Sequence, residues 1–260
     1  MTTMNTFIPR RIKKTKIIAT ISNTQCAPEF LTALHQAGMD VVRLNSAHQS
    51  PDEALAVIKN VRAVSDRIAI LVDTKGPEIR TTPTCEEICV KTGDIIRVRG
   101  AKGEMSCREC VCLTYNGLVN DLAVNDRLLI DDGEVELLVI DKDTTGLRCR
   151  VCNDGQIRGH KGVNIPSVSI RLPSLTAKDE DFVRFAADND LDFIAHSFVR
   201  NKEDVLAIQK ILDEKKSTVK IIAKIENQEG VDNIDEILDH AYGAMIARGD
   251  LAVEIPAERI

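Results

Sequence analysis

The residues best suited to chemistry are charged or polar and directly follow short apolar runs of the 260-residue sequence. Cationic side chains are more numerous among them than a sugar-binding site would need. In a parallel barrel, chemistry collects where strands run into the following loops, so these side chains should face one pocket. The set comprises Arg43, Asn45, His48, Asp73, Lys75, Glu78, Arg80, His196, Ser197, Lys224, Glu226, Arg248 and Asp250.

Lys224 and Glu226 suggest the most specific chemistry in this set. They stand two apart on a predicted strand, so both side chains project from the same face. Together with Asp250 after the next strand, Glu226 can supply carboxylate oxygens to Mg²⁺, which prefers one or two carboxylates plus substrate oxygens and water. Gly249 lets backbone amides approach an anion closely. The alternative is a purely structural ion pair between the lysine and the carboxylates.

The elements that must position these residues are six short, nearly continuous apolar runs. Such runs are typical of strands in a parallel sheet that is buried on both faces. Four of the five intervals between their starts are 23–28 residues long, which fits one βα unit each. The runs are Ile17–Ser22, Val41–Asn45, Ile68–Asp73, Phe193–Ser197, Ile221–Glu226 and Ala244–Arg248.

Helix signals fill the short intervals. A polar capping residue is followed three positions later by an acid, which is typical of a helix start. Gly38 and Gly243 stand just before strands, where helix ends or turns are expected. The predicted helix starts are Ser50 with Pro51 and Glu53, Thr176 with Asp179, and Asn201 with Asp204.

The long interval, between the third and fourth apolar runs, has a different sequence pattern and is predicted to be an inserted small all-β barrel. Short apolar runs around Asp132-Gly133 and Thr145-Gly146 indicate hairpins. The fold class is therefore α/β, with a TIM-type (β/α)8 barrel and an inserted β domain. The predicted domains are the first part of the barrel at residues 1–80, the β-barrel cap at 81–168 and the second part of the barrel at 169–260.

A complete (β/α)8 barrel has eight strands, and only six are visible before Ile260. The sequence predicts either a barrel truncated after about six βα units or an open barrel that is completed by association. In an open parallel sheet, the first and sixth strands would be exposed edges.

Composition excludes several functional classes. With 43% hydrophobic residues, 28% charged residues and no apolar run near the ~20 residues of a membrane helix, no membrane span is expected. A net charge of −6 argues against binding nucleic acid. The basic segment Met1–Lys16 faintly resembles a transit peptide but lacks an apolar core, so we expect a frayed terminus and a cytoplasmic location.

The eight cysteines raise the question of disulfides or zinc. A large domain with an ample core does not need disulfides. The pairs Cys107-x2-Cys110 and Cys149-x2-Cys152 are 38 residues apart, beyond the ~15–20 typical of a zinc ribbon. The second pair lies on a predicted strand, where positions i and i+3 point to opposite faces. Reduced, scattered thiols are expected, with structural zinc as the alternative.

Several of these segments together resemble the pyruvate kinase family. They cover about residues 15–260 in the family's order, with the β insertion in the matching place. The Asp73–Arg80 and Lys224–Asn227 stretches are highly specific in combination. The segments are Lys16–Ile21, Val42–Asn45, Val72–Arg80, Lys161–Pro166, Ile222–Gly230 and Ala247–Glu254.

The resemblance implies the glycolytic transfer of a phosphoryl group from phosphoenolpyruvate to ADP, followed by protonation of the enolate to pyruvate. Glu226 and Asp250 would hold Mg²⁺ or Mn²⁺. Arg43 would bind the phosphate, and Lys224 would neutralise charge on the phosphoryl group in flight. The amides around Gly249 and Asp250 would receive the substrate carboxylate.

The resemblance also assigns the nucleotide and the monovalent cation. Asn45, His48, Arg80 and Lys161 would contact the nucleotide, with Lys161 arriving as the β cap closes and excludes water. Asn45, Asp73 and Thr74 match the family's K⁺ ligands, and Glu78 matches the residue typical of K⁺-dependent members.

One departure from the family concerns the K⁺ site. The family usually has Arg-Leu-Asn-Phe-Ser-His where this chain has Arg-Leu-Asn-Ser-Ala-His, so the ligating hydroxyl is missing at Ala47. Ser46 stands one position before the place of the missing hydroxyl. A water molecule or a shifted backbone could take the place of that hydroxyl as a ligand. The sequence therefore predicts K⁺ activation with weaker binding.

Two other functions remain open at this point. One is another Mg²⁺-dependent barrel enzyme that acts on an enolate, and the other is a non-catalytic module that binds phosphate or nucleotide. The family's substrate-binding Thr lies past Ile260, so we expect the 260-residue chain to be inactive by itself. The resemblance implies a homotetramer for the full-length protein.

Overall fold

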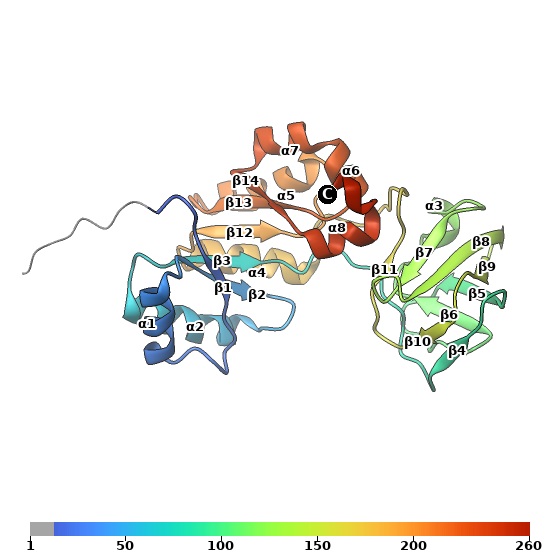
Figure 1. Ribbon diagram of the computed structural model, residues 1–260. Helices are drawn as coiled ribbons and strands as arrows, with labels where there is room; N and C mark the ends of the chain where they lie inside the picture. Colours follow the sequence, from blue (N-terminus) through green and yellow to red (C-terminus); the bar gives the residue numbers. More distant parts are fainter. Residues whose placement is uncertain (1–12) are drawn as a thin grey trace, which may run out of the picture.

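Six parallel strands form the central sheet of the computed structural model, which describes residues 13–260 (Figure 1). All six predicted strands are confirmed, in the order β1-β2-β3-β12-β13-β14. Neighbouring strands are parallel, so their carboxyl ends share one edge of the sheet. The strands are β1 Ile18–Thr20, β2 Val41–Asn45, β3 Ala69–Asp73, β12 Phe193–His196, β13 Lys220–Ile225 and β14 Gly243–Ile246.

Helices follow these strands and complete six βα units of a TIM-type barrel. Reciprocal capping boxes open α2 and α4, and the Asn201 side chain caps α5, which confirms the predicted helix starts. Gly38 ends α1 with a left-handed φ of 115°, whereas Gly243 is the first residue of β14 rather than a turn before it. The helices are α1 Pro28–Ala37, α2 Pro51–Val64, α4 Ala177–Asp188, α5 Lys202–Glu214, α6 Gln228–Asp232, α7 Ile234–His240 and α8 Arg248–Glu254, with a 3₁₀ turn at Ala257–Arg259.

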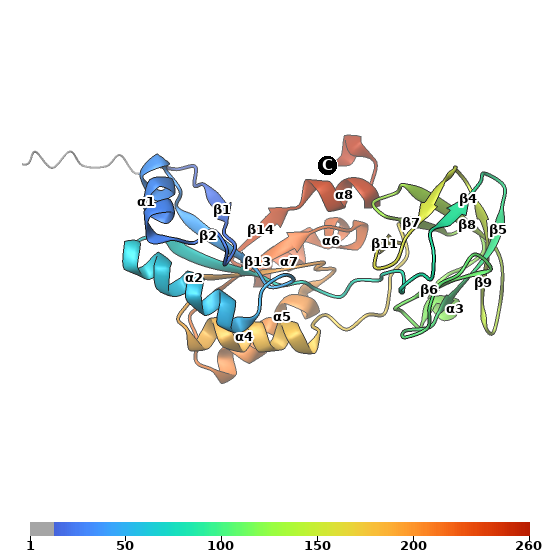
Figure 2. The ribbon, with the colours of Figure 1, turned by 90° about the horizontal axis from the view of Figure 1, so that it is seen from below.

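The two faces of the sheet pack against different partners. Leu44 on β2 belongs to the main core between the sheet and its helices, of which α2, α4 and α5 lie along one side in Figure 2. Val41 on the same strand points to the opposite face, where it packs with Leu71. Both faces therefore need apolar residues, which explains the nearly continuous apolar runs. On the outer strands, Ile18 is 47% exposed and Ile246 is 48% exposed.

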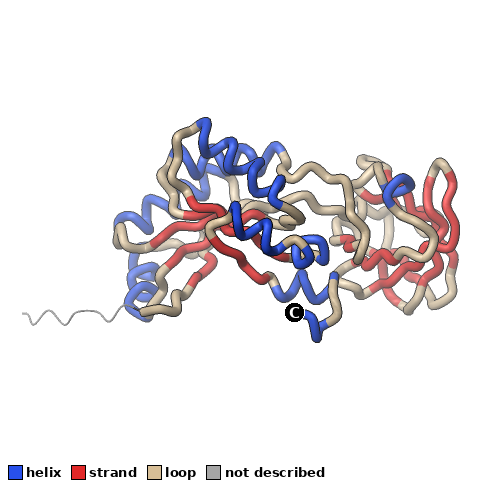
Figure 3. The backbone as a smooth tube through the Cα atoms, turned by 90° about the horizontal axis from the view of Figure 1, so that it is seen from above, coloured by secondary structure: helices blue, strands red, loops and turns tan. Residues whose placement is uncertain are grey.

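The segment between β3 and β12 forms a separate lobe of mostly antiparallel strands, seen in red with one short blue helix in Figure 3. Its six-stranded sheet has the order β11-β7-β8-β9-β5-β6, and β10 pairs with β4. The predicted hairpins are confirmed as β7-β8 and β8-β9. The elements are β4 Ile88–Val90, β5 Ile95–Gly100, β6 Cys110–Leu113, α3 Leu118–Asp121, β7 Arg127–Ile130, β8 Val135–Asp143, β9 Gly146–Val151, β10 Gly155–Ile157 and β11 Val163–Asn164. The domain limits 80/81 and 168/169 stay a prediction, and α3 was not expected.

All eight cysteines are free thiols in the described part of the chain. Cys149 is fully buried on β9, and burial raises the pKa of its thiol to about 12, so it stays protonated at neutral pH. Cys107 and Cys110 face one another across a tight turn. Among residues 13–260, no group of three or more His, Cys, Asp or Glu residues is arranged to hold a metal ion.

Two sequence expectations concern the ends and surface of the molecule. The possible targeting segment lies mostly in residues 1–12, outside the described residues. Lys13 is described, and its ammonium donates to the Asp40 carboxylate and the Gly38 carbonyl. Over residues 13–260, no helix is both long enough and apolar enough to cross a membrane.

Asp179 joins the two places where the chain leaves and re-enters the barrel. Its Oδ1 accepts the amide N–H groups of Lys75 (3.0 Å) and Gly76 (3.4 Å), where the chain departs for the β lobe. Its Oδ2 accepts the amide (3.0 Å) and the hydroxyl (2.6 Å) of Thr176, where the chain returns. The side chain is fully buried. One carboxylate thus ties both connections to the start of α4.

Replacing Asp179 by Ala should lower the free energy of unfolding by about 3 kcal/mol, because buried donors lose their acceptor. Urea unfolding of the Asp179→Ala variant measures this change. The matched control is Asp181→Ala, an exposed position on the same helix, which should change stability by no more than ~0.5 kcal/mol. Equal stability of the two variants would contradict the role of Asp179.

Candidate active site

An arginine and a buried aspartate pair at the carboxyl ends of β2 and β3. Arg43 Nε donates to Asp73 Oδ2 at 2.6 Å, and Arg43 Nη1 donates to the Thr20 hydroxyl at 2.9 Å. The Asp73 side chain is 2% exposed and that of Arg43 is 29% exposed. Because Asp73 fixes the inner part of the guanidinium, the exposed part is held in place to meet an anion.

Lys224 at the end of β13 lies at the centre of the site. Its Nζ is 2.9 Å from Glu226 Oε1 and 3.3 Å from Asp73 Oδ1, and it donates to Ser197 Oγ at 2.7 Å. The side chain is 11% exposed. Burial disfavours its charge, but the two carboxylates outweigh burial and hold the pKa of Lys224 above its usual value. Lys224 is therefore a fixed, permanently charged ammonium at neutral pH.

Glu226 is a buried carboxylate with a like charge nearby. Its Oε2 accepts the Phe198 amide N–H at 2.7 Å, and the residue is 1% exposed. Burial, the largest effect, raises the pKa of Glu226, and the Asp250 carboxylate adds to the rise, although Lys224 partly offsets it. Asp250 stands in the exposed first turn of α8. Two carboxylates that repel each other beside a cleft fit a divalent cation, which would relieve that repulsion.

The three predicted K⁺ ligands lie in adjacent positions. Asn45 and Asp73 are register partners on neighbouring strands, and Thr74 follows directly. Asp73 is already paired with Arg43 and Lys224, so any further cation there would have to share its oxygens. The buried Ser46 hydroxyl has no hydrogen-bond partner. Oxygens of this kind fit a monovalent cation, although Asn45 Oδ1 also accepts the Ala47 amide N–H at 3.0 Å.

A cleft of about 480 Å³ opens between the barrel and the β lobe. Its lining includes Glu78, Arg80 and Asp250, whereas Arg43, Lys224 and Glu226 lie outside it. The chemistry-bearing cluster therefore adjoins the cleft rather than lining it.

The predicted nucleotide contacts are spread around the site. Arg80 pairs with Glu78, and its Nη1 donates to the His160 carbonyl at 2.7 Å. Lys161 is paired with Asp131 of the β lobe at 2.9 Å. His48 is exposed at the end of the β2 loop and does not line the cleft. The structure thus brings Arg80 to the cleft wall, but it does not gather all four predicted contacts.

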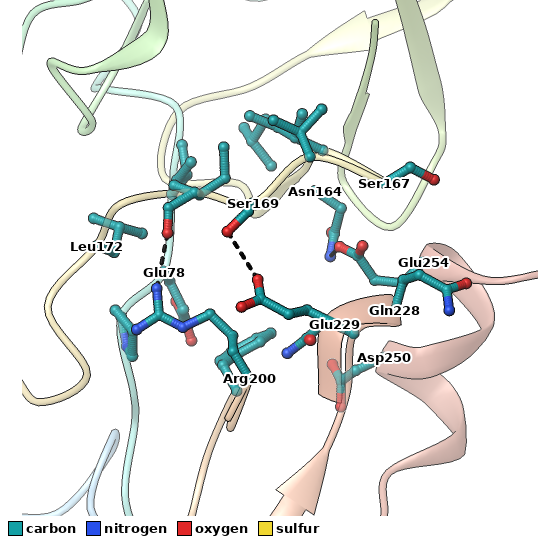
Figure 4. Close-up of a pocket in the computed structure, with 18 of the residues that line it drawn as sticks. Glu78, Asn164, Ser167, Ser169, Leu172, Arg200, Gln228, Glu229, Asp250 and Glu254 are labelled. Carbon is teal, nitrogen blue, oxygen red and sulfur yellow. Dashed lines mark hydrogen bonds between the residues drawn. The ribbon is translucent and has the colours of Figure 1, made fainter. Parts of the chain in front are cut away.

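Sequence reasoning missed three contacts that connect the returning segment to the barrel (Figure 4). Asn164 Nδ2 donates to Glu254 Oε1 at 2.8 Å, and the Ser169 hydroxyl donates to Glu229 Oε2 at 2.9 Å. Arg200 Nη1 donates to the Ile170 carbonyl at 2.8 Å. Burial raises the pKa of Glu254. Asn164 and Glu254 both lie in segments that resemble the family, but nothing in the sequence indicates that their side chains pair.

His196 at the end of β12 is a site residue to which the sequence assigned no role. It is 1% exposed, and burial lowers the pKa of its imidazole to about 4, so it is neutral at physiological pH. Its Nδ1 lies 3.4 Å from the Thr74 hydroxyl, and its Nε2 has no partner.

Comparison with known proteins gives one consistent result. The family model "Pyruvate kinase, barrel domain" matches residues 12–260. A pyruvate kinase of Borreliella burgdorferi is 48% identical over 249 residues, covering 95% of this chain and 52% of that protein. A pyruvate kinase from Staphylococcus epidermidis is 44% identical over 261 residues, covering 96% of this chain and 44% of that protein.

A solved structure agrees with these relatives. The crystal structure of a pyruvate kinase from Cryptosporidium parvum matches with a TM-score of 0.90 and 36% identity, over 95% of this chain and 53% of that one. The chain spans about half the length of the curated relatives that it matches.

Proposed function

The chain belongs to the pyruvate kinase family, and we propose that the protein containing it transfers the phosphoryl group of phosphoenolpyruvate to ADP, giving pyruvate and ATP. The observation that carries this proposal is the ammonium of Lys224, held between Asp73, Glu226 and Ser197 at the carboxyl edge of the sheet. Phosphoryl transfer depends mainly on alignment and on electrostatic stabilisation of the moving group. A fixed buried cation supplies both.

Each residue of the site has a specific task in this proposal. Glu226 and Asp250 would hold Mg²⁺ or Mn²⁺, which would act as a Lewis acid that offsets negative charge on the substrate. Arg43 binds the phosphate of phosphoenolpyruvate, and Lys224 neutralises charge on the phosphoryl group as it moves. The amides of Gly249 and Asp250, at the start of α8, receive the substrate carboxylate. The enolate that remains takes up a proton to become pyruvate.

The nucleotide enters from the side of the β lobe in this proposal. Asn45, His48, Arg80 and Lys161 contact its phosphates, and closure of the lobe brings them together and excludes water. Lys161 must then exchange its Asp131 partner for a phosphate oxygen. We further propose that the protein acts in the cytoplasm as a homotetramer.

Asn45, Asp73 and Thr74 would hold K⁺ beside the phosphate site. Ala47 lacks the hydroxyl that members of the family usually provide, so the cation would be bound by one protein oxygen fewer. Ser46 supports this proposal because its buried oxygen is unpaired.

The activity is tested by measuring pyruvate formation in the natural full-length protein with Mg²⁺ and K⁺. Replacing Lys224 by Met should lower kcat by roughly 10²–10³-fold, because a charge that acts mainly in the transition state is lost. Lys220→Met, an exposed lysine on the same strand, is the matched control and should leave kcat unchanged. Binding of phosphoenolpyruvate without turnover would instead indicate a non-catalytic module.

The K⁺ site is tested by restoring the missing hydroxyl. The unsubstituted protein should be more active in K⁺ than in Na⁺, and Ala47→Ser should lower the half-activating K⁺ concentration several-fold. The control, Ala54→Ser on α2, should leave that concentration unchanged. Equal activity in Na⁺ and K⁺ would overturn the proposed K⁺ site.

A further inference from the structure

His196 is a buried polar residue that the proposed mechanism does not use. It ends β12 directly before Ser197, and it is 1% exposed. Burying a polar side chain costs free energy unless its hydrogen bonds are satisfied. Here only Nδ1 has a polar neighbour, the Thr74 hydroxyl at 3.4 Å, and Nε2 has none. An imidazole retained at that cost calls for an explanation in terms of what Nδ1 does.

The Thr74 hydroxyl connects this imidazole to the loop that carries the site. Thr74 Oγ1 accepts the amide N–H of Ser197 at 3.1 Å and lies 3.3 Å from the Ala195 carbonyl oxygen. The Ser197 hydroxyl donates to the Thr74 carbonyl at 2.7 Å. Thr74 and Ser197 are therefore joined by two hydrogen bonds in opposite directions. Lys224 Nζ in turn donates to Ser197 Oγ at 2.7 Å.

The donors and acceptors in this chain fix the state of the imidazole. The Ala195 carbonyl oxygen already accepts the Thr74 amide N–H at 2.9 Å, and its second lone pair accepts the single hydroxyl proton of Thr74. Thr74 Oγ1 then accepts from two N–H groups, those of Ser197 and of His196 Nδ1. This leaves Nε2 as a bare acceptor, and an unpaired buried acceptor is tolerated better than an unpaired buried N–H. The imidazole is therefore the neutral Nδ1–H tautomer.

We propose that His196 is a positioning residue for Lys224 in the phosphoryl-transfer step, an inference that rests on the proposed function. Its Nδ1–H holds the Thr74 hydroxyl in the orientation that receives the Ser197 amide. The Ser197 hydroxyl is thereby aimed so that it donates to Thr74 and accepts from Lys224. Without the imidazole, the Thr74 hydroxyl can turn and Ser197 can shift, so the ammonium loses one of its three anchors.

Three substitutions of His196 in the natural full-length protein distinguish this role from simple packing. The amide nitrogen of Asn reaches the place of Nδ1, that of Gln reaches the place of Nε2, and Leu has neither. We expect His196→Leu to lower kcat at least tenfold with little change in the KM for phosphoenolpyruvate. His196→Asn should return kcat to within about threefold of the unsubstituted protein, and His196→Gln should not.

The control for general loss of packing is Ile194→Val, a buried position on the same strand that faces the helices. It should lower the melting temperature without changing kcat. The proposal is overturned if His196→Leu keeps kcat within twofold, or if His196→Gln restores kcat as well as His196→Asn does.

Two measurements do not depend on turnover. Nitrogen-15 NMR of histidine-labelled protein, with His196→Asn to assign the signal, should show the Nδ1–H tautomer, and the Nε2–H tautomer would overturn the proposal. A crystal structure of His196→Leu should show Lys224 Nζ moved away from Ser197 Oγ, and an unchanged contact would also overturn it. If that variant does not crystallise, the NMR result decides. Absence of turnover in the unsubstituted protein contradicts the proposed function, whereas these measurements judge the hydrogen-bond chain.

Discussion

The rest of the site depends on one interaction, the ion pairing of Lys224 with the buried carboxylates of Asp73 and Glu226. Removing Lys224 would leave the Glu226 carboxylate without an ion-pair partner where water cannot solvate it, which is costly. The three residues lie on β3 and at the end of β13, so the pairing also holds together strands from the two parts of the chain on either side of the β lobe. The same constraint that stabilises the sheet edge therefore fixes a cation at the place where the proposed phosphoryl transfer would need one.

The connections to the β lobe are built around this fixed edge. Asp179 anchors the chain where it leaves the barrel and where it returns, so the base of the lobe is rigid. Beyond that base, Asn164 of the lobe pairs with Glu254, and Ser169 in the segment that returns to the barrel pairs with Glu229. The Ser169–Glu229 hydrogen bond is solvent-exposed and separates at little cost, whereas the buried ion pairs do not. The closure of the lobe in the proposed function would have to break these polar pairs and leave the buried ion pairs in place.

The sequence predicted the strands, the capped helices and the family motifs well, because each is a local signal. Ser50 with Glu53 and Lys224 with Glu226 are two or three residues apart, and their geometry follows from helix and strand periodicity. The contacts that it did not predict join Asn164 to Glu254 across 90 residues and Thr74 to His196 across 122. Pairings of that kind are set by tertiary packing. Neither the Asp131 partner of Lys161 nor the unpaired Ser46 hydroxyl had any local signature.

In the proposed function, Glu226 and Asp250 would complete this charged edge as a divalent cation site. Electron paramagnetic resonance of Mn²⁺ added to the natural full-length protein tests it most directly, because free and bound Mn²⁺ are distinguished without any turnover. One bound Mn²⁺ per chain is expected, with binding weakened at least tenfold by Glu226→Gln and unchanged by Glu229→Gln, which alters a carboxylate that lines the cleft. Mn²⁺ binding that is absent, or equally strong in both variants, would contradict it.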